Sequence, residues 1–212
     1  MTQLPRGRHG LSRKYIAEHQ RARLFGAVAA VLDSKGYAGT TVSAVAGEAG
    51  ISKSDFYNQF KSKDDCFLAA YDAALERLRA DVLVACGARE GWAESVCAGL
   101  EAALAALSAA PAEANLLLVE GLCAGPDVCA RFRRAVESFV PYLRQGAPPT
   151  AGTGPAALAT DEAVIGGIAS LIGRRVLAGE GARLSQFFPE LAEFALSPYL
   201  GVAEARRIIS AG

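Results

Sequence analysis

The chain has little of the chemistry that most enzymes need. It contains two histidines, His9 and His19, both near the N-terminus, and its cysteines include no C-x-x-C pair. No glycine-rich phosphate loop is found, and no group of His, Cys and Asp has the spacing of metal ligands. The sequence therefore predicts a protein that is not an enzyme, with no catalytic residue, no metal site and no cofactor.

Long hydrophobic runs are also missing. The basic N-terminus is not followed by the apolar segment of a secretory signal. The longest uncharged stretches, such as Ala102–Ala112 and Ala163–Gly173, have about half the length of a membrane span. Because 51% of the residues are hydrophobic, the chain can still form a packed core. We expect a folded cytoplasmic protein with no membrane partner.

Cysteine usage leaves two interpretations open. The five cysteines are odd in number and lie within apolar helical patterns, where we expect reduced core thiols. A thiol redox sensor is the alternative. The residues are Cys66, Cys86, Cys97, Cys123 and Cys129.

Charge is distributed unevenly, although the formal net charge is zero. Residues 1–63 hold ten Lys and Arg against four Asp and Glu, a charge of +6. Residues 64–212 hold twelve Arg against eighteen acidic residues, a charge of −6, and no lysine follows Lys63. A basic N-terminal part joined to an acidic remainder is typical of a DNA-binding domain attached to another domain.

The segment Thr41–Lys63 has the pattern of a helix-turn-helix. The threonine at its start can cap a short helix, which Gly50 ends because glycine accepts the left-handed conformation. Ser52 can then cap a second short helix with Phe56 and Phe60 on its buried side. Two short helices joined by a tight turn present the second one outward, in a shape that fits a DNA major groove.

The same segment closely resembles the DNA-binding domain of TetR-type transcriptional regulators, through the run T-V-x-x-V-A-x-x-A-G-I-S-K-x-x-F-Y-x-x-F-x-x-K. The preceding helix (Arg21–Lys35, then Gly36-Tyr37) and the stretch Asp64–Tyr71 also match, so the resemblance covers about residues 20 to 71. It implies an all-α fold in which a three-helix DNA-binding domain is joined to a larger helical domain for ligand binding and dimerisation. No period-two strand pattern is found, and we expect nine or ten helices.

Three parts are expected along the chain. Residues 1–14 form a basic flexible arm, residues 15–62 the helix-turn-helix domain, and residues 63–212 the ligand-binding and dimerisation domain. The cations of the arm either enter a DNA minor groove or form a solubilising tail. They are Arg6, Arg8, Arg13 and Lys14.

The outward face of the second helix carries the residues expected to contact DNA. Lys53 can meet a phosphate or a guanine edge, and Asn58 has the groups for a pair with adenine. The resemblance implies that Tyr57 is the most characteristic contact. Thr41 and Lys63, at two other helix N-termini, either contact phosphate or serve as a cap and a surface charge. The predicted set is Thr41, Ser52, Lys53, Ser54, Tyr57, Asn58 and Lys63.

Asp55 departs from the family pattern, which commonly has a small or neutral residue at this position. A carboxylate is repelled by phosphate, although it can accept a hydrogen bond from cytosine N4. The spacing Ser52-x-x-Asp55 is that of a capping box, so we expect the acid to fold back on the helix start. Ser62-x-x-Asp65 repeats this spacing.

The C-terminal part supplies two further sets of candidates. Residues of the middle helices can line a cavity for an apolar or amphipathic effector, although each would also serve as ordinary core. The last long helices offer small and apolar residues for a homodimer junction, or for packing within one chain. The cavity candidates are Tyr71, Trp92, Val96, Leu117, Glu120, Phe132, Val136 and Phe139. The dimer candidates are Gly167, Leu171, Phe187, Phe188, Leu191 and Phe194.

These features predict a ligand-responsive, sequence-specific transcriptional regulator. We expect a repressor that occupies a palindromic operator on double-stranded DNA as a homodimer and responds to a small-molecule effector. The alternative is a ligand-independent or low-specificity DNA-organising protein with the same DNA-binding domain.

Overall fold

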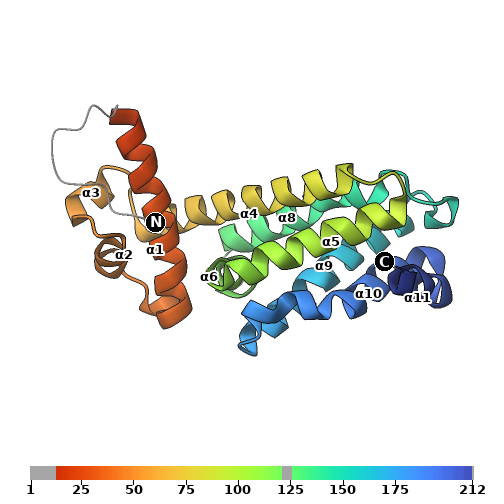
Figure 1. Cartoon of the computed structure of the whole chain (residues 1–212). Coiled ribbons are helices and arrows are strands. Elements are labelled where there is room, and N and C mark those ends of the chain that lie inside the picture. The colour runs from red at the N-terminus through yellow and green to blue at the C-terminus, as the bar shows by residue number, and fades with distance from the viewer. Residues whose placement is uncertain (1–12, 121–125, 212) are drawn as a thin grey trace. The chain divides into compact units, whose positions relative to one another are not determined.

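The structure is a computed structural model that describes residues 13–120 and 126–211 (Figure 1). All regular elements in these residues are helical and ten of them are α-helices, which confirms the all-α prediction. The chain divides into two compact units, of which the first ends at Ala73 and the second begins at Ala74.

The predicted flexible arm falls largely outside the described residues, as do its cations Arg6 and Arg8. Arg13 and Lys14 are the first two residues of the first helix. Cys123 also lies outside the described residues.

The first unit contains three helices and the beginning of a fourth. α1 packs against α2, and α2 against α3. α1 is interrupted at Gly36, where φ is 65° and ψ is 173°, so the regular helix stops at the predicted glycine and one further turn follows. The helices are α1 (Arg13–Gly39), α2 (Val42–Ala49), α3 (Lys53–Tyr57) and α4 (Lys63–Gly87), and α4 continues into the second unit.

Side-chain caps set the ends of α2 and α4. Thr41 Oγ1 accepts a hydrogen bond of 3.2 Å from a backbone N–H in the first turn of α2, and Gly50 ends this helix with φ of 63°, as predicted. Ser62 Oγ accepts from the N–H of Asp65 at 3.1 Å. The carboxylate of Asp65 accepts from the N–H of Lys61 at 3.0 Å, so it turns toward the residue before the cap.

The start of α4 belongs to the core of the first unit. Cys66 and Phe67 are buried there, and the ring of Phe67 meets the ring of Tyr37 edge-on, with 5.2 Å between centroids. The division between the two compact units therefore lies within α4, after Ala73. Other large side chains buried in this unit are Leu24, Val28, Leu32, Val45, Phe56 and Phe60.

The second unit contains the rest of α4 and all later helices. α9 packs against α8 and α10, and α10 packs against α5 and α11. The helices are α5 (Trp92–Ala109), α6 (Pro111–Asn115), the π-helix η1 (Leu116–Glu120), α8 (Pro126–Arg144), α9 (Pro155–Leu177), α10 (Phe188–Leu200) and α11 (Val202–Ala211), with the 3₁₀ turns η2 (Pro149–Ala151) and η3 (Gly181–Phe187).

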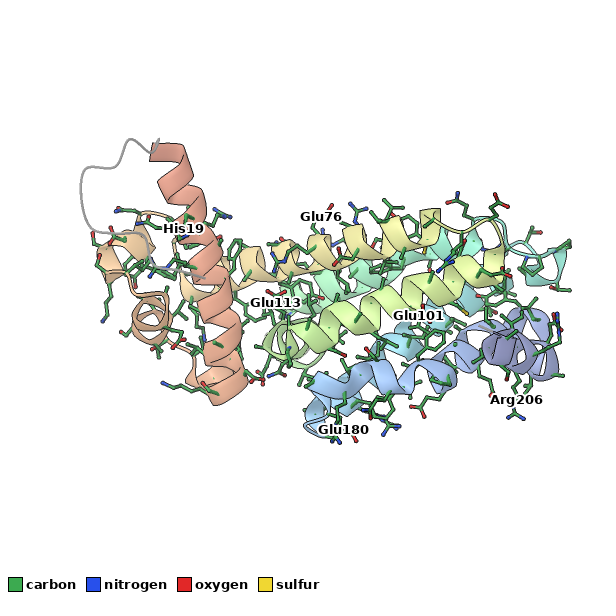
Figure 2. The ribbon with its side chains drawn as sticks, viewed as in Figure 1. His19, Glu76, Glu101, Glu113, Glu180 and Arg206 are labelled. Carbon is green, nitrogen blue, oxygen red and sulfur yellow. The ribbon has the colours of Figure 1, made fainter. Side chains whose placement is uncertain are left out.

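Ion pairs join neighbouring helices on the surface of the second unit. Arg77 of α4 pairs with Glu113 of α6 at 2.8 Å, and Arg206 of α11 pairs with Glu193 of α10 at 2.9 Å. Glu113 and Arg206 are labelled in Figure 2. Because these side chains are 33% to 67% exposed, each pair contributes little to stability. Each pair nevertheless shows that the two helices it joins lie next to each other.

α9 is more apolar than its uncharged segment suggested. The helix has 23 residues, and an 18-residue window within it has a mean hydropathy of 1.4. By length and composition alone it could cross a membrane, although its uncharged stretch Ala163–Gly173 is about half a span. The core helix of a soluble protein has the same properties, so the finding is weak evidence for a membrane. Only 22% of the window is buried within the chain.

Candidate nucleic-acid interface

α3 begins with a complete capping box. Ser52 Oγ accepts a hydrogen bond of 3.0 Å from the N–H of Asp55, and the N–H of Ser52 donates to the carboxylate of Asp55 at 3.3 Å. Ser52 Oγ also donates to this carboxylate at 2.7 Å. Asp55 therefore folds back on the helix start, as the capping-box interpretation predicted, and its charge is placed near the helix N-terminus, where it is favourable.

The remaining surface of α3 separates into a buried side and an exposed side. Phe56 is fully buried and Phe60 is 3% exposed. Tyr57 is 57% exposed, although its ring meets the ring of Phe56 edge-on with 5.5 Å between centroids. A large aromatic side chain held open to solvent in this way is available to a partner. The exposed residues of this segment include Ser52, Lys53, Ser54, Tyr57 and Asn58, which are the five predicted contacts from the second helix.

Lys63 has partners within the protein. Its Nζ donates a hydrogen bond of 3.2 Å to the carbonyl of Tyr37 and lies 4.0 Å from the centroid of the same ring. The Tyr37 hydroxyl donates to the carboxylate of Asp64 at 2.5 Å. Burial and the neighbouring Asp64 raise the pKa of Tyr37 to about 12. Lys63 and Asp64 thus join the start of α4 to the turn after Gly36.

Sequence reasoning missed three residues of α1 that contact the end of α2 or the residues directly after α3. Arg23 donates to the backbone carbonyl of Ala49, the last residue of α2. Gln20 accepts a hydrogen bond of 3.3 Å from the side-chain amide of Gln59. The guanidinium of Arg21 lies 4.8 Å from the centroid of the Phe60 ring. These contacts join residues that are distant in sequence, so local spacing could not predict them.

The cavity candidates occupy different parts of the fold. Trp92 and Val96 pack against a buried cluster that contains Leu143 and Tyr199. The indole Nε1 of Trp92 donates to the carbonyl of Leu143 at 2.6 Å, which satisfies its one donor. Tyr71 falls in the first compact unit and the other candidates in the second. Leu117 is buried, and Glu120, Phe132, Val136 and Phe139 are half-buried.

One dimer candidate is corrected by the structure. Leu191 is only 2% exposed within a single chain, so it is a core residue with no surface left for a partner. A Cβ placed on Gly167 would lie 2.7 Å from Cζ of Phe194, so this ring packs on the glycine within the chain. Leu171, Phe187 and Phe188 are half-buried, and the guanidinium of Arg175 lies 4.0 Å from the centroid of the Phe187 ring.

Three large apolar side chains on α9 and α10 nevertheless remain exposed within the single chain. Phe194 is 40% exposed, and α9 adds Leu158 at 47% and Leu177 at 71%. Sequence reasoning missed the two leucines because their spacing along α9 does not distinguish an exposed position from a core position. We call Leu158, Leu177 and Phe194 the α9–α10 apolar surface.

Burial keeps the described core thiols protonated. It raises the pKa of Cys66 to about 12 and that of Cys97 to about 11, and it also raises the pKa of Cys86. The thiolate is the form that reacts with oxidants, so these three residues are poor redox sensors at neutral pH. The interpretation as core thiols is favoured for them.

Comparison with known proteins identifies the DNA-binding domain. Residues 25–70 match the family model of the bacterial regulatory proteins of the tetR family. No curated protein matches the sequence.

Several solved structures share the fold over most of the chain. FadR from Bacillus halodurans, a fatty acid degradation regulator, is 14% identical with a TM-score of 0.73, and the match covers 86% of this chain and 96% of that one. FadR from Bacillus subtilis in complex with stearoyl-CoA is 15% identical with a TM-score of 0.68 and covers 85% and 98%. A TetR-like transcriptional regulator from Rhodococcus sp. RHA1 is 20% identical with a TM-score of 0.66 and covers 88% and 97%. The resemblance to the TetR family is therefore confirmed for the helix-turn-helix, and most of the chain shares the fold of these solved structures.

Proposed function

We propose that this protein is a ligand-responsive transcriptional repressor that acts in the cytoplasm as a homodimer on a palindromic operator. The observation that carries the proposal is the exposed face of α3, where Lys53, Tyr57 and Asn58 stand open to solvent on a helix with a complete capping box. These side chains supply a cation for phosphate or guanine, a phenol for phosphate and an amide for adenine. The +6 charge of residues 1–63 supports attraction to DNA.

Thr41 and Lys63 are assigned supporting roles at the same interface. Thr41 is exposed and its Oγ1 already caps α2, so its hydroxyl proton remains available to a phosphate oxygen. Lys63 has three N–H donors and uses one on the carbonyl of Tyr37, which leaves donors for phosphate. Both residues therefore act as structural groups and as phosphate contacts.

The homodimer follows from the size of the reading helix. α3 has five residues and can contact only a few base pairs, so a specific site requires two copies about 34 Å apart along the DNA. The α9–α10 apolar surface supports this assembly, because three large apolar side chains are exposed there, two of them on α9, whose 18-residue window has a mean hydropathy of 1.4. A symmetric dimer would bury this surface against its own copy.

An amphipathic molecule with an acyl chain is the effector class that we propose. The relative from Bacillus subtilis was solved in complex with stearoyl-CoA, and its fold matches 85% of this chain. The second unit of this chain is helical and rich in apolar residues, with Leu117, Phe132, Val136 and Phe139 as candidate contacts. An effector of this kind releases DNA only if it binds one arrangement of the dimer better than the other.

α4 is the element that we propose to transmit effector binding. It begins at Lys63 beside α1 and continues into the second unit, where Arg77 pairs with Glu113 of α6 at 2.8 Å. A change at α6 would therefore act directly on α4.

Binding of the purified protein to DNA flanking its own gene, against scrambled DNA over a salt series, tests the proposal. We expect tight binding to one palindrome with a steep salt dependence, and loss of this binding in Tyr57→Ala. Lys53→Gln should lower the salt slope by about 1.8, since one phosphate contact is lost in each protomer of the dimer. Lys35→Gln removes the same charge from an exposed site on α1 and is the matched control.

Equal and weak binding to both DNAs would contradict a sequence-specific regulator. It would instead favour the low-specificity DNA-organising protein. In a second stage, stearoyl-CoA is added to the operator complex, and unchanged binding at saturating ligand would exclude this molecule as effector.

A further inference from the structure

α3 is too short to define its own position. It has five residues, and helices of this length are not stable in water without tertiary contacts. The capping box satisfies the backbone at its start but does not determine its orientation on the rest of the unit. The orientation of the reading side chains must therefore come from contacts made by other helices.

Arg23 supplies such a contact on the side where α3 begins. Its guanidinium donates to the carbonyl of Ala49, which ends α2 directly before the turn at Gly50. Carbonyls at a helix C-terminus lack partners within the helix and carry negative partial charge, so a guanidinium is a favourable donor to them. Arg23 is half-buried, which shields this bond from water and holds the turn from which α3 starts.

Gln20 and Arg21 supply contacts on the side where α3 ends. The amide of Gln59 donates to Oε1 of Gln20 at 3.3 Å, and the guanidinium of Arg21 lies 4.8 Å from the centroid of the Phe60 ring. Gln59 and Phe60 follow α3 within three residues. One short stretch of α1 thus contacts the chain both before and after the reading helix.

We propose that Arg23 and Gln20 are positioning residues of the DNA interface. They brace α3 from both sides, so that Tyr57 and Asn58 meet the groove at a defined angle, and they do not contact DNA themselves. This role rests on the proposed function of α3 as the reading helix. It assigns to α1 a share in sequence specificity, because a misplaced α3 would still meet phosphates but would not align with base edges.

The DNA-binding test compares Arg23→Gln with the control Lys35→Gln, which makes the same charge change at an exposed site of α1. For Arg23→Gln we expect operator affinity to fall about tenfold or more, since a hydrogen bond from a charged donor is lost. Affinity for scrambled DNA and the salt slope should stay as in wild type, because no counterion release depends on Arg23. A slope lowered by about 1.8, which is one phosphate contact per protomer of the dimer, with equal losses on both DNAs, would mean a phosphate contact and would overturn the proposal.

A second measurement needs no DNA. Hydrogen exchange of the full-length protein should be faster over residues 53–60 in Arg23→Gln and unchanged there in Lys35→Gln. Gln20→Ala removes the contact on the other side without altering charge, and it decides the question if Arg23→Gln does not fold. Unchanged exchange over residues 53–60 in the folded variants would contradict the positioning role of Arg23 and Gln20. A wild-type protein without operator preference would instead contradict the proposed function. The exchange result would still show whether Arg23 and Gln20 hold α3 in position.

Discussion

The hydroxyl of Tyr199 donates a hydrogen bond of 2.7 Å to the carboxylate of Asp161, a side chain only 1% exposed. The same carboxylate is paired with Arg144, which also donates to the carbonyl of Gly152 at 3.1 Å. Thr150 donates to the carbonyl of Tyr199 at 2.7 Å. Burial, followed by the bond to Asp161, raises the pKa of Tyr199 above its ordinary value. This network joins the end of α8, the η2 turn, α9 and α10.

Replacement of Asp161 by asparagine should destabilise the second unit. Asp161→Asn keeps the size of the side chain but leaves the guanidinium of Arg144 without its counter-ion. We expect the free energy of unfolding to fall by about 3 kcal/mol, the lower end for a broken buried pair, because the Arg144 side chain is 29% exposed. Urea denaturation measures the change. The exposed neighbour gives the control Glu162→Gln, with a change within about 0.5 kcal/mol, and equal losses in the two variants would contradict the network's role.

The hydrogen bond between Tyr37 and Asp64 should weaken at high pH. The pKa of Tyr37 is about 12 in the folded protein, above its ordinary value of 10.0, so the folded state holds the proton more tightly. The stabilisation is complete below pH 10 and is lost as the pH rises through 12. We expect the free energy of unfolding of wild type to exceed that of Tyr37→Phe by about 1 kcal/mol near pH 9. This difference should shrink as the pH approaches 12. Urea midpoints at several pH values test this, and a difference independent of pH would refute it.

Thiol labelling should distinguish the buried cysteines from the exposed one. Burial raises the pKa of Cys66 and Cys97 to about 12 and about 11, whereas Cys129 lies exposed on α8. We expect iodoacetamide at neutral pH to modify Cys129 well before Cys66 or Cys97, as followed by peptide mass spectrometry.

Peroxide treatment extends the same test to function. If peroxide abolishes DNA binding in wild type but not in a Cys-free variant, the protein is a thiol sensor.

The labelling experiment has its own contrary outcome. Comparable labelling rates at Cys66 and Cys129 would show that the first unit opens readily.

The α9–α10 apolar surface should govern assembly. Leu177→Glu places a charge on a side chain that is 71% exposed, so the single chain tolerates it. A dimer through this surface would bury the charge twice, and we expect its dissociation constant to rise on the order of 100-fold. Sedimentation equilibrium measures this change. Val84→Glu, at a residue 75% exposed on α4, is the control and should leave the dimer intact. Equal effects of both variants would place the interface elsewhere.

Several local features could be predicted from sequence because their interactions span only a few residues. The cap at Thr41 and the capping box of Ser52 and Asp55 each join groups three positions apart, and the left-handed conformation of Gly50 depends on its own lack of a side chain. The burial of Phe56 beside the exposed Tyr57 follows from helical spacing. The exposed face of α3 could therefore be predicted residue by residue.

The C-terminal candidates could not be sorted in the same way. An apolar residue such as Leu191 has the same helical spacing in the sequence whether it faces the core or a second chain. In the structure its side chain lies in the core and is 2% exposed. Leu177 has a similar local pattern and is 71% exposed. Helical spacing states which residues share a face, but burial depends on which helix covers that face.

The all-α class, the helix-turn-helix and the uneven charge follow from the amino-acid sequence alone, because each depends on local spacing or on composition. Helix packing was needed to establish that Arg23 donates to the carbonyl of Ala49, that Lys63 donates to the carbonyl of Tyr37, and that Asp161 is buried. The partners in the first two contacts are 26 residues apart. Contacts over such separations arise when helices pack, since a side chain's partner is then set by how the chain returns on itself rather than by its neighbours in sequence.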